Sequence, residues 1–515
     1  METHCFVPRG YEGHLVTVEV DIRPGIPGTD IVGLPGGAVR EARERVRTAV
    51  RNVGLRYPQD RVIINLVPAG VPKTGASFDL AIALAVLSAS EQIHPEPDDH
   101  VLALGELQLS GRLRPVAGVL AAVVAARTAG IHKVVVPSSN AAEAAITPGI
   151  TVFGVDTLPE AIASVAPATS RRAIGAYTRE AAVASREVPL CDGTPGVAGE
   201  TDFAEVRGQA IAKRACQIAA AGGHSLLLVG PPGVGKSLIL SCFSSILPNL
   251  MGNRAIEATR IHSLAGTLRH SGGLLRRPPV RRPHHSASVE GLVGGGARVV
   301  PGEVSLAHGG VLCLDEALEF PPRVLQSLRQ PLQEGHVSVV RAGEQYWFPA
   351  EFQLLMATNP CPCGYRNSHG GRCLCSELEI ARYWKRLGGA LLDRVELRLE
   401  LIQEADDLYS DAATESSRLL AQGVCAARER QYRRYGDESL NAAAPYSSLR
   451  RLAGLTGPAE TMLRAGGTHL RLSNRGVLQA VRVARTIADL DEKDGVDEVS
   501  VSEALQYRRY AAEWE

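Results

Sequence analysis

The chain has 515 residues, too many for one compact hydrophobic core, so its length predicts about three domains. Lys plus Arg and Asp plus Glu number 55 each, which excludes a global field that would steer the protein to DNA or to a membrane. Any nucleic-acid surface must therefore come from local segregation of charge. No apolar run is long enough to cross a bilayer and the first ten residues lack the pattern of a secretory signal, so the expected location is the cytoplasm.

Residues 1–165 alternate strand-like and helix-like stretches, which predicts a first α+β domain. Its expected strands are residues 14–22, 61–69 and 132–137, and its expected helices are residues 36–54, 78–90 and 113–130. Residues 166–200 contain scattered Pro, Gly and Ser without an apolar period, a composition that predicts a linker.

A second domain is expected over residues 201–401, where a helix at 210–221 precedes a short apolar strand that enters a glycine-rich loop. Residues 402–515 have the apolar period of helices and predict a C-terminal helical lid. Its expected helices are residues 450–455, 459–466, 475–490 and 501–513. The expected fold class is therefore α/β, with an α/β core between the α+β domain and the lid.

Residues 230–237, GPPGVGKS, fit the phosphate-loop pattern without a mismatch, between an expected strand and an expected helix. Glycines let the backbone wrap closely, so that successive N–H groups and the helix N-terminus face the phosphates. Lys236 is expected to reach the β- and γ-phosphates, and Ser237 to ligate magnesium. The alternative is a chance glycine-rich turn. The predicted ATP-binding residues are Gly230, Pro231, Pro232, Gly233, Val234, Gly235, Lys236 and Ser237, with Gln209.

Two acidic residues, Asp315 and Glu316, end an apolar strand-like stretch. Asp315 is placed to hold magnesium through its water shell, and Glu316 to polarise the attacking water. Asn359 ends a further strand-like stretch and suits the positioning of the same water. An adjacent Asp–Glu pair also occurs on ordinary surfaces, but its place at a strand end favours ATP hydrolysis.

Two arginines are candidates to complete the site, Arg394 in LLDRVEL and Arg475 in LSNRG. An arginine that stabilises transition-state charge is often supplied by a neighbouring subunit. The alternative is that both are ordinary surface residues, because the chain has many other basic side chains.

Several segments together resemble the magnesium-chelatase-like AAA+ proteins of the ComM/YifB family. The segments are DFAEVRGQAIAKRACQIAAAGGHSLLLVGPPGVGKS, RRPHHSASVEGLVGGG, PGEVSLAHGGVLCLDEALEF, MATNPCPCG, LLDRVEL and LSNRGVLQAVRVARTIADL. DEALEF stands where DELPEF is usual, and Ser237 replaces the commoner Thr. The resemblance implies a hexameric ring with Arg394 as a finger acting in trans and Arg475 as a second sensor. It also implies a DNA helicase that promotes branch migration when incoming DNA is integrated during natural transformation.

The first 165 residues resemble the Lon protease domain in PKTGASFDLAIAL, GELQLSGRLRPVAG and AARTAGIHKVVVPSSN. Lon proteases use a Ser–Lys dyad, and Ser77 falls at or near the position of the nucleophile. The segment expected to hold the lysine contains only Ala, Gly, Leu and Val from Ala117 to Ala126. The sequence therefore predicts an inactive domain that serves as a scaffold or recognition module.

Residues 258–289 contain no acidic residue, although the chain as a whole is charge-balanced. AAA+ rings often place an inserted loop at this position, facing the central channel, where arginines can engage phosphates without reading sequence. The alternative is a solvated loop that contacts a neighbouring subunit. The basic residues of this arginine-rich insert are Arg260, Arg269, Arg276, Arg277, Arg281 and Arg282, with His262, His270, His284 and His285.

A second DNA-facing candidate is the predicted β-hairpin at residues 334–350, with Arg341, Ala342 and Gly343 at its turn. It resembles the hairpin that carries a channel-lining basic residue in replicative MCM helicases. Arg341 is therefore the expected DNA contact here, beside Arg281, Arg282, His284 and His285 in the insert. The alternative is a purely structural hairpin.

Four of the ten cysteines form two CxC pairs within fifteen residues: Cys361, Cys363, Cys373 and Cys375. Four thiolates at this spacing can surround a tetrahedral zinc ion, and the alternative is a set of reduced thiols in a loop. A metal site at His284 and His285 is a weaker alternative, because adjacent side chains point in different directions in most backbones.

The leading hypothesis is a ring-forming ATPase that needs ATP and Mg²⁺ and translocates on branched or single-stranded DNA without sequence preference. The second is a magnesium-chelatase-type motor that remodels a protein partner, which would share the ATPase core. The third is an ATP-dependent protease. DNA binding distinguishes the first two hypotheses, and degradation of an unfolded protein substrate tests the third.

Overall fold

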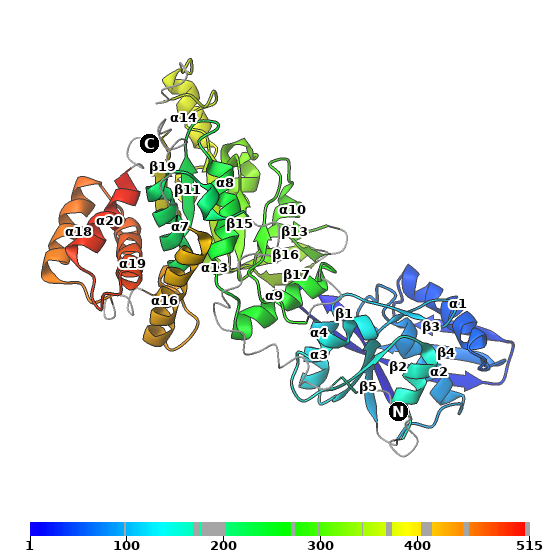
Figure 1. The fold of residues 1–515 in the computed structure, drawn as a ribbon. Coiled ribbons are helices and arrows are strands. Elements are labelled where there is room, and N and C mark those ends of the chain that lie inside the picture. Colours follow the sequence, from blue (N-terminus) through cyan, green and yellow to red (C-terminus); the bar gives the residue numbers. More distant parts are fainter. Residues whose placement is uncertain are drawn as a thin grey trace.

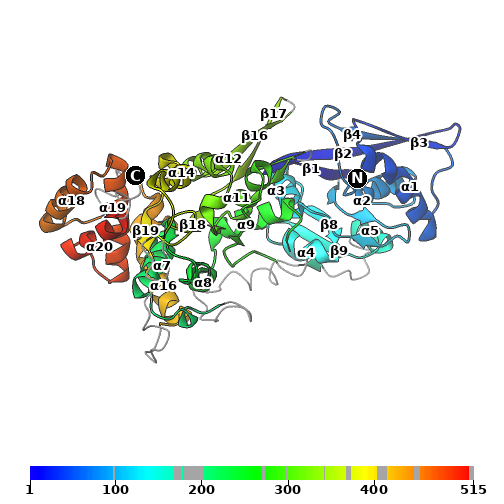
Figure 2. The ribbon, with the colours of Figure 1, turned by 90° about the horizontal axis from the view of Figure 1, so that it is seen from above.

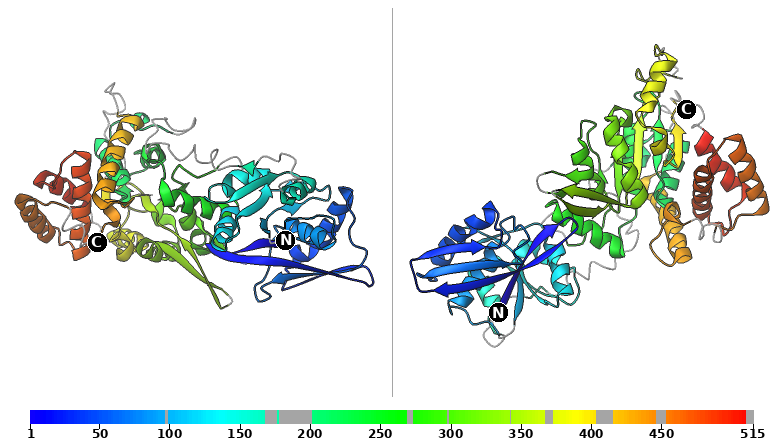
Figure 3. Two further views of the ribbon diagram at one scale, coloured as in Figure 1. Left: turned by 90° about the horizontal axis from the view of Figure 1, so that it is seen from below. Right: turned by 180° about the vertical axis from the view of Figure 1, so that it is seen from behind.

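The computed structural model describes residues 1–96, 99–167, 176–177, 201–268, 273–296, 299–341, 343–366, 373–402, 415–445 and 453–509. The chain forms an N-terminal α+β domain, a parallel α/β core and a C-terminal helical domain, with the core in the middle (Figures 1 and 3). Apart from 166–167 and 176–177, the predicted linker lies outside these residues. Within them, the helices are all too short or too polar to span a bilayer.

An eight-stranded mixed sheet organises the N-terminal domain, in the order β10-β9-β8-β5-β1-β2-β4-β3. Its strands are β1 (Glu2–Arg9), β2 (Glu12–Arg23), β3 (Gly28–Val32), β4 (Arg61–Val67), β5 (His100–Ala103), β8 (Lys133–Pro137), β9 (Thr151–Val155) and β10 (Ala176–Tyr177). Its helices are α1 (Gly37–Asn52), α2 (Asp79–Ala89), α3 (Val119–Thr128), α4 (Ser138–Ala144) and α5 (Leu158–Val165). The helix α2 is apolar on all sides because it packs against α1, β1 and β2.

Two features of this domain differ from the sequence analysis. The expected helix at 113–130 begins only at Val119. Gly118, its N-cap residue, adopts a left-handed conformation with φ +79° and so lies outside the helix. The preceding Leu113–Arg114 forms a small strand, β7, that pairs with β6 (Glu106–Leu107). The strand β1 was not predicted, yet it lies in the middle of the sheet between β2 and β5.

A five-stranded parallel sheet forms the core, in the order β12-β15-β18-β11-β19. The strands are β11 (Leu226–Val229), β12 (Val280–Arg281), β15 (Val311–Leu314), β18 (Gln353–Thr358) and β19 (Leu397–Glu400). Helices cover both faces, so the strands are buried on both sides and read as continuous apolar runs. Alternate side chains of β11 accordingly belong to two different apolar clusters, Leu226 and Leu228 to one and Leu227 and Val229 to the other.

The helices around this sheet follow the strands in alternation. They are α7 (Ala210–Gly222), α8 (Lys236–Cys242), α9 (Gly252–Leu264), α10 (Val289–Val293), α11 (Glu303–Leu306), α12 (Pro322–Ser327), α13 (Arg329–Glu334), α14 (Glu377–Lys385) and α15 (Gly389–Leu392). Two hairpins are added, β13 (Gly294–Gly295) with β14 (Val300–Pro301), and β16 (His336–Arg341) with β17 (Glu344–Pro349). The second confirms the hairpin predicted at 334–350, and Figure 2 shows it projecting from the core.

The C-terminal domain consists of helices, as predicted. They are α16 (Ser417–Tyr435), α18 (Gly457–His469), α19 (Asn474–Leu490) and α20 (Glu498–Arg509). The buried carboxylate of Asp489 on α19 accepts hydrogen bonds from Arg434 on α16 and from Arg485, which ties the two helices together. The helix expected at 450–455 is wrong in its described part, where Leu455 instead bridges to Val496.

The N-terminal domain docks on the core through α9 and the β16–β17 hairpin. Tyr11, in the turn between β1 and β2, packs against Trp347 with ring centroids 5.1 Å apart. The guanidinium of Arg260 on α9 lies 4.1 Å from the centre of the Tyr11 ring, and Arg9 pairs with Glu344 at 3.0 Å. The hairpin is therefore held by the N-terminal domain along one side.

Candidate functional site

The order of the core strands brings the predicted nucleotide-binding residues to one edge of the sheet. The strand β18 lies between β11 and β15, and all three are parallel. The phosphate loop follows β11, Asp315 and Glu316 follow β15, and Asn359 follows β18. Because the carboxyl ends of parallel strands meet at one edge, these groups converge there.

The phosphate loop forms an open cradle. Gly233 and Gly235 have φ values of +82° and +94°, which favour glycine, and a Cβ atom at either residue would meet no other atom within 4 Å. Gly230 is packed instead, since a Cβ there would lie 2.9 Å from the Leu401 carbonyl oxygen. The loop thus has one wall fixed against the core and an open side that fits a chain of phosphates.

Lys236 lies at the centre of this edge. Its ammonium donates hydrogen bonds to the carbonyl oxygens of Gly230 (2.6 Å) and Pro231 (2.8 Å) and to Oδ1 of Asn359 (3.1 Å). Burial lowers the pKa of Lys236 to about 8, and the carboxylates of Asp315 and Glu316 oppose that shift. The sequence prediction that these four side chains share one site agrees with this geometry.

The carboxylates of Asp315 and Glu316 make different contacts. Oδ1 of Asp315 accepts a hydrogen bond from the backbone N–H of Glu316 at 3.0 Å. Glu316 itself adopts a left-handed conformation, φ +51°, and its side chain is exposed. Strained backbone of this kind occurs where the surrounding structure over-determines the position of a side chain. Oε2 of Glu316 lies 3.6 Å from Nδ1 of His285.

The place of His285 was missed by the sequence analysis, which considered the insert as a contact with DNA, with a neighbouring subunit or with a metal, and not as a neighbour of Glu316. The rings of His284 and His285 lie 4.0 Å apart, so the expectation that adjacent histidines point apart is wrong here. Among the described residues, these two histidines are not part of a cluster of metal-ligating side chains. The insert therefore reaches the carboxylate of Glu316 through His285.

Gln209 lies beside the start of the phosphate loop. It adopts φ +53° at the N-terminus of α7, and its Nε2 donates to the carbonyl of Ile402 at 2.8 Å. That carbonyl directly follows Leu401, against which Gly230 packs. Gln209 thus stands at the edge of the cradle.

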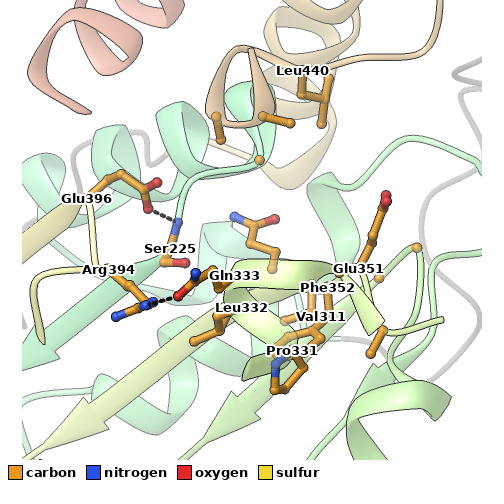
Figure 4. A pocket seen from close by; sticks show the side chains of 18 of the residues that line it. Ser225, Val311, Pro331, Leu332, Gln333, Glu351, Phe352, Arg394, Glu396 and Leu440 are labelled. Atoms are coloured by element: carbon orange, nitrogen blue, oxygen red, sulfur yellow. Dashed lines mark hydrogen bonds between the residues drawn. The ribbon is translucent and has the colours of Figure 1, made fainter. Parts of the chain in front are cut away.

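Arg394 and Arg475 lie at the opposite edge of the sheet. They line a cavity of about 510 Å³ together with residues that directly precede the strands, such as Ser225 before β11 and Glu396 before β19 (Figure 4). A strand of four residues spans about 13 Å, so these arginines are separated from the phosphate loop of their own chain by the length of β11. Nη2 of Arg394 donates to Oε1 of Gln333 at 2.7 Å.

The two arginines are close enough to affect each other electrostatically. Arg475 forms an ion pair of 3.8 Å with Asp393, the residue before Arg394. Burial, and after it the charge of Arg475, lower the pKa of Arg394. Two neighbouring guanidinium groups in a cavity repel each other, and an anion bound beside both would relieve this repulsion.

The insert arginines are engaged within the chain. Arg281 pairs with Glu303 through hydrogen bonds of 2.6 and 2.8 Å, and Arg282 donates to Ser241 Oγ and the Leu240 carbonyl. These contacts give Arg281 and Arg282 structural partners. The insert residues Arg269 and His270 lie outside the described residues. Arg341 is exposed at the hairpin end, where its Nη1 donates to the Gly296 carbonyl.

The four cysteines come together. Sγ of Cys361 lies 3.3 Å from that of Cys363 and 3.7 Å from that of Cys373, and the sulfur atoms of all four cysteines lie within 4.8 Å of one another. Four thiolates around a zinc ion at about 2.3 Å stand about 3.8 Å apart, so the donor set and its spacing fit zinc.

Ser77 has no base in the position that a Ser–Lys dyad needs. The segment expected to supply the lysine forms the buried helix α3. Among the described residues, no lysine or histidine side chain hydrogen-bonds to the Ser77 hydroxyl, while its carbonyl accepts from Cys5. A serine hydroxyl without a neighbouring base is a weak nucleophile.

Comparisons with known proteins decide the family. Models described as magnesium chelatase, subunit ChlI, match residues 18–140, 202–408 and, for its C-terminal part, 414–508. YifB of Escherichia coli is 38% identical over 98% of this chain and 96% of its own length. The competence protein ComM of Haemophilus influenzae is 36% identical over 97% of this chain and 95% of its own length. The chain belongs to the ComM/YifB family.

Its N-terminal domain is also similar to part of the Lon proteases. Lon protease 2 of Thermus thermophilus is 33% identical over 144 residues, which cover 26% of this chain and 18% of that protein. The family match, the parallel α/β core and the helical C-terminal domain identify an AAA+ protein of the magnesium-chelatase type. Membership of this class indicates ATP hydrolysis with Mg²⁺. The phosphate loop provides a cradle that fits the phosphates, and the carboxylates of Asp315 and Glu316 lie at the same edge of the sheet.

Proposed function

We propose that this chain is a ring-forming, cytoplasmic ATPase that moves along branched or single-stranded DNA and drives branch migration, as the resemblance to ComM implies. The contact between His285 and Glu316 carries the proposal. It links a basic, DNA-facing insert to the residue that polarises the attacking water. DNA binding and ATP hydrolysis can then act on each other through one side chain.

The residues of the cradle divide the chemistry of hydrolysis. Backbone N–H groups of the phosphate loop and the Lys236 ammonium hold the phosphates, and Glu316 accepts a proton from the attacking water. Asn359, fixed by its hydrogen bond to Lys236, orients that water. Ser237 and Asp315 would hold Mg²⁺, which neutralises charge on the phosphates when bound.

A ring of six subunits completes this site. Arg394 and Arg475 cannot serve their own phosphate loop, because β11 separates them from it. In a ring with head-to-tail interfaces, one edge of each core faces the opposite edge of the next. The arginine pair then stabilises the charge that develops on the nucleotide of the neighbouring subunit.

Arg341 is the proposed contact with the DNA backbone. It ends β16, in the hairpin that projects from the core in Figure 2, and exposed Val340 lies beside it. Among the described residues, Arg341 forms no ion pair with a carboxylate. An arginine in this position can engage a phosphate without reading sequence. Arg281 and Arg282 stabilise the insert in this account, and His284 remains a proposed secondary contact.

The test measures ATP hydrolysis by the full chain with and without forked DNA. Wild type is expected to hydrolyse ATP faster with DNA, whereas Lys236→Ala loses ATP binding and Glu316→Gln binds ATP without hydrolysing it. An ATPase that neither binds DNA nor responds to it would contradict the proposal.

A second candidate function is a magnesium-chelatase-type motor that remodels a protein partner, which the family models favour by their description. It shares the ATPase core but gives the hairpin and the insert no role in binding DNA. A stable protein partner together with an absence of DNA binding would support it. Proteolysis is disfavoured by the missing base, and casein degradation by wild type and Ser77→Ala tests it.

A further inference from the structure

The four-cysteine cluster brings together the residues after β18 and the residues before α14. Cys361 and Cys363 lie shortly after β18 and Asn359, whereas Cys373 and Cys375 lie shortly before α14. Cys361 is buried and the other three are partly buried. The shortest sulfur–sulfur separation is 3.3 Å, far longer than a disulfide bond, so the thiols are free to act as ligands. Soft thiolates select zinc over hard cations such as magnesium.

The cluster rests directly on the phosphate loop. Gly364 follows Cys363 and adopts φ +84°, and its N–H donates to the Cys361 carbonyl at 3.0 Å. A Cβ atom at Gly364 would lie 2.8 Å from both Cγ and Cδ of Pro232 and 3.7 Å from Cγ of Asn359. Only glycine permits this close approach. The loop that carries two of the thiolates is therefore packed between Pro232 and Asn359.

The helix α14, which follows the cluster, also contacts the residues at the end of β18 and just after it. Nε1 of Trp384 on α14 donates to the carbonyl of Pro360 at 3.1 Å. Tyr383 places its hydroxyl 3.5 Å from that of Thr358, the last residue of β18. A metal ion held by all four cysteines would join β18 to α14 at one point. Asn359 lies between these attachments and the ammonium of Lys236.

We propose that Cys361, Cys363, Cys373 and Cys375 bind one Zn²⁺ and that this site positions Asn359 for hydrolysis. The inference rests on the ATPase activity proposed above. ATP binding depends on the cradle, whose Gly230 side packs against Leu401 and does not contact the cluster. Water orientation depends on Asn359, which the cluster holds. Loss of zinc therefore lowers kcat strongly and changes the affinity for ATP little.

The test measures zinc content by mass spectrometry, binding of a fluorescent ATP analogue, and kcat on the full chain. Wild type is expected to contain about one zinc per chain, and Cys373→Ser with Cys375→Ser almost none. For that double variant, kcat is expected to fall at least about tenfold, while the Kd for the nucleotide changes less than about threefold. Cys5→Ser, in the core of the N-terminal domain, is the matched control and leaves all three quantities unchanged.

Gly364→Ala tests the positioning of Asn359 without removing a zinc ligand. This variant keeps all four ligands, so its zinc content stays at the wild-type value while the added methyl group meets Pro232 and kcat falls. Wild type without stoichiometric zinc, even after growth and purification with added zinc, would overturn the site. Zinc loss with unchanged kcat would overturn the positioning role. Wild type that binds zinc and ATP but never hydrolyses ATP would instead refute the proposed ATPase.

Discussion

His285 lies 3.6 Å from Glu316, so the last part of the arginine-rich insert reaches the carboxylate that we propose polarises the attacking water. The contact is an ion pair when the imidazole is protonated. A carboxylate engaged in this way is less available to the attacking water, and movement of the insert on DNA would release it. In the proposed function, this pair is the route by which DNA binding raises the rate of hydrolysis.

His285→Ala removes this contact and leaves Glu316 free without DNA. The DNA-free ATPase rate is expected to rise about threefold, in line with the energy of a partly exposed ion pair, and stimulation by DNA is expected to shrink. His284→Ala is the control, because His284 contacts Ser286 at 2.8 Å instead of Glu316. Equal effects of the two substitutions on the DNA-free rate would refute the assignment.

The pKa of Lys236, lowered to about 8 by burial, predicts a pH dependence of ATP binding. Phosphates favour the charged form of Lys236. ATP binding therefore takes up a proton at any pH at which the lysine of the empty site is deprotonated. The affinity for a non-hydrolysable ATP analogue is therefore constant below about pH 7 and falls as the pH rises above about 8.

Calorimetry in two buffers of different ionisation enthalpy measures this uptake, which is expected to be about half a proton at pH 8. Lys236→Arg is the comparison, because a guanidinium keeps its charge throughout this range and removes the uptake. Binding of the analogue to wild type without proton uptake near pH 8 would show that the lysine is fully charged before the nucleotide arrives.

The position of Arg394 predicts that one subunit completes the site of another. Arg394→Ala is expected to bind ATP normally but to lose at least about a hundredfold in kcat. Lys236→Ala is inactive for the opposite reason, because it retains the arginine and lacks the lysine that holds the phosphates. In mixed rings of the two variants, about a quarter of the interfaces combine an intact phosphate loop with an intact Arg394.

Mixing the two inactive proteins is therefore expected to restore ATP hydrolysis, as measured by phosphate release. Double substitution of Lys236 and Arg394 in one chain is the control, since mixing it with wild type cannot create a new complete interface. Mixed rings that stay inactive would show that Arg394 acts elsewhere.

The docking of the N-terminal domain predicts that it supports the hairpin proposed to bind DNA. Tyr11→Ala removes the packing against Trp347 and Arg260, and DNA affinity is expected to fall about fivefold, the equivalent of about 1 kcal/mol for one aromatic pair. Tyr11→Phe keeps the ring and is expected to bind DNA as wild type does. Fluorescence anisotropy with a labelled forked DNA measures both, and an unaffected Tyr11→Ala would assign the contact to domain docking alone.

Local patterns predicted those parts of the molecule whose signal lies in consecutive residues. The phosphate loop, the strand ends at Asp315 and Asn359, and the β16–β17 hairpin were all visible in this way. The helix α3 was predicted to start too early, because the residues before Gly118 hid the left-handed glycine that forms its N-cap.

Contacts between distant segments could not be predicted from the sequence. The strand β1 has no alternation, since it is buried on both faces in the middle of the sheet, and its pairing with β5 spans about a hundred residues. The approach of His285 to Glu316 and the packing of Gly364 on Pro232 depend on tertiary structure alone. Composition placed the basic insert at the central channel or against a neighbouring subunit, whereas the fold also brings His285 to Glu316.

The measurement that tests the central claim most directly is migration of a branched DNA substrate by the full chain, with ATP. Wild type is expected to convert a labelled four-way junction into duplex products, Glu316→Gln to bind the junction without converting it, and Arg341→Ala to hydrolyse ATP while converting much less. Arg323→Ala, on the exposed start of α12, is the matched control and converts the junction as wild type does. Wild type that hydrolyses ATP yet leaves forked and four-way substrates intact would contradict the account.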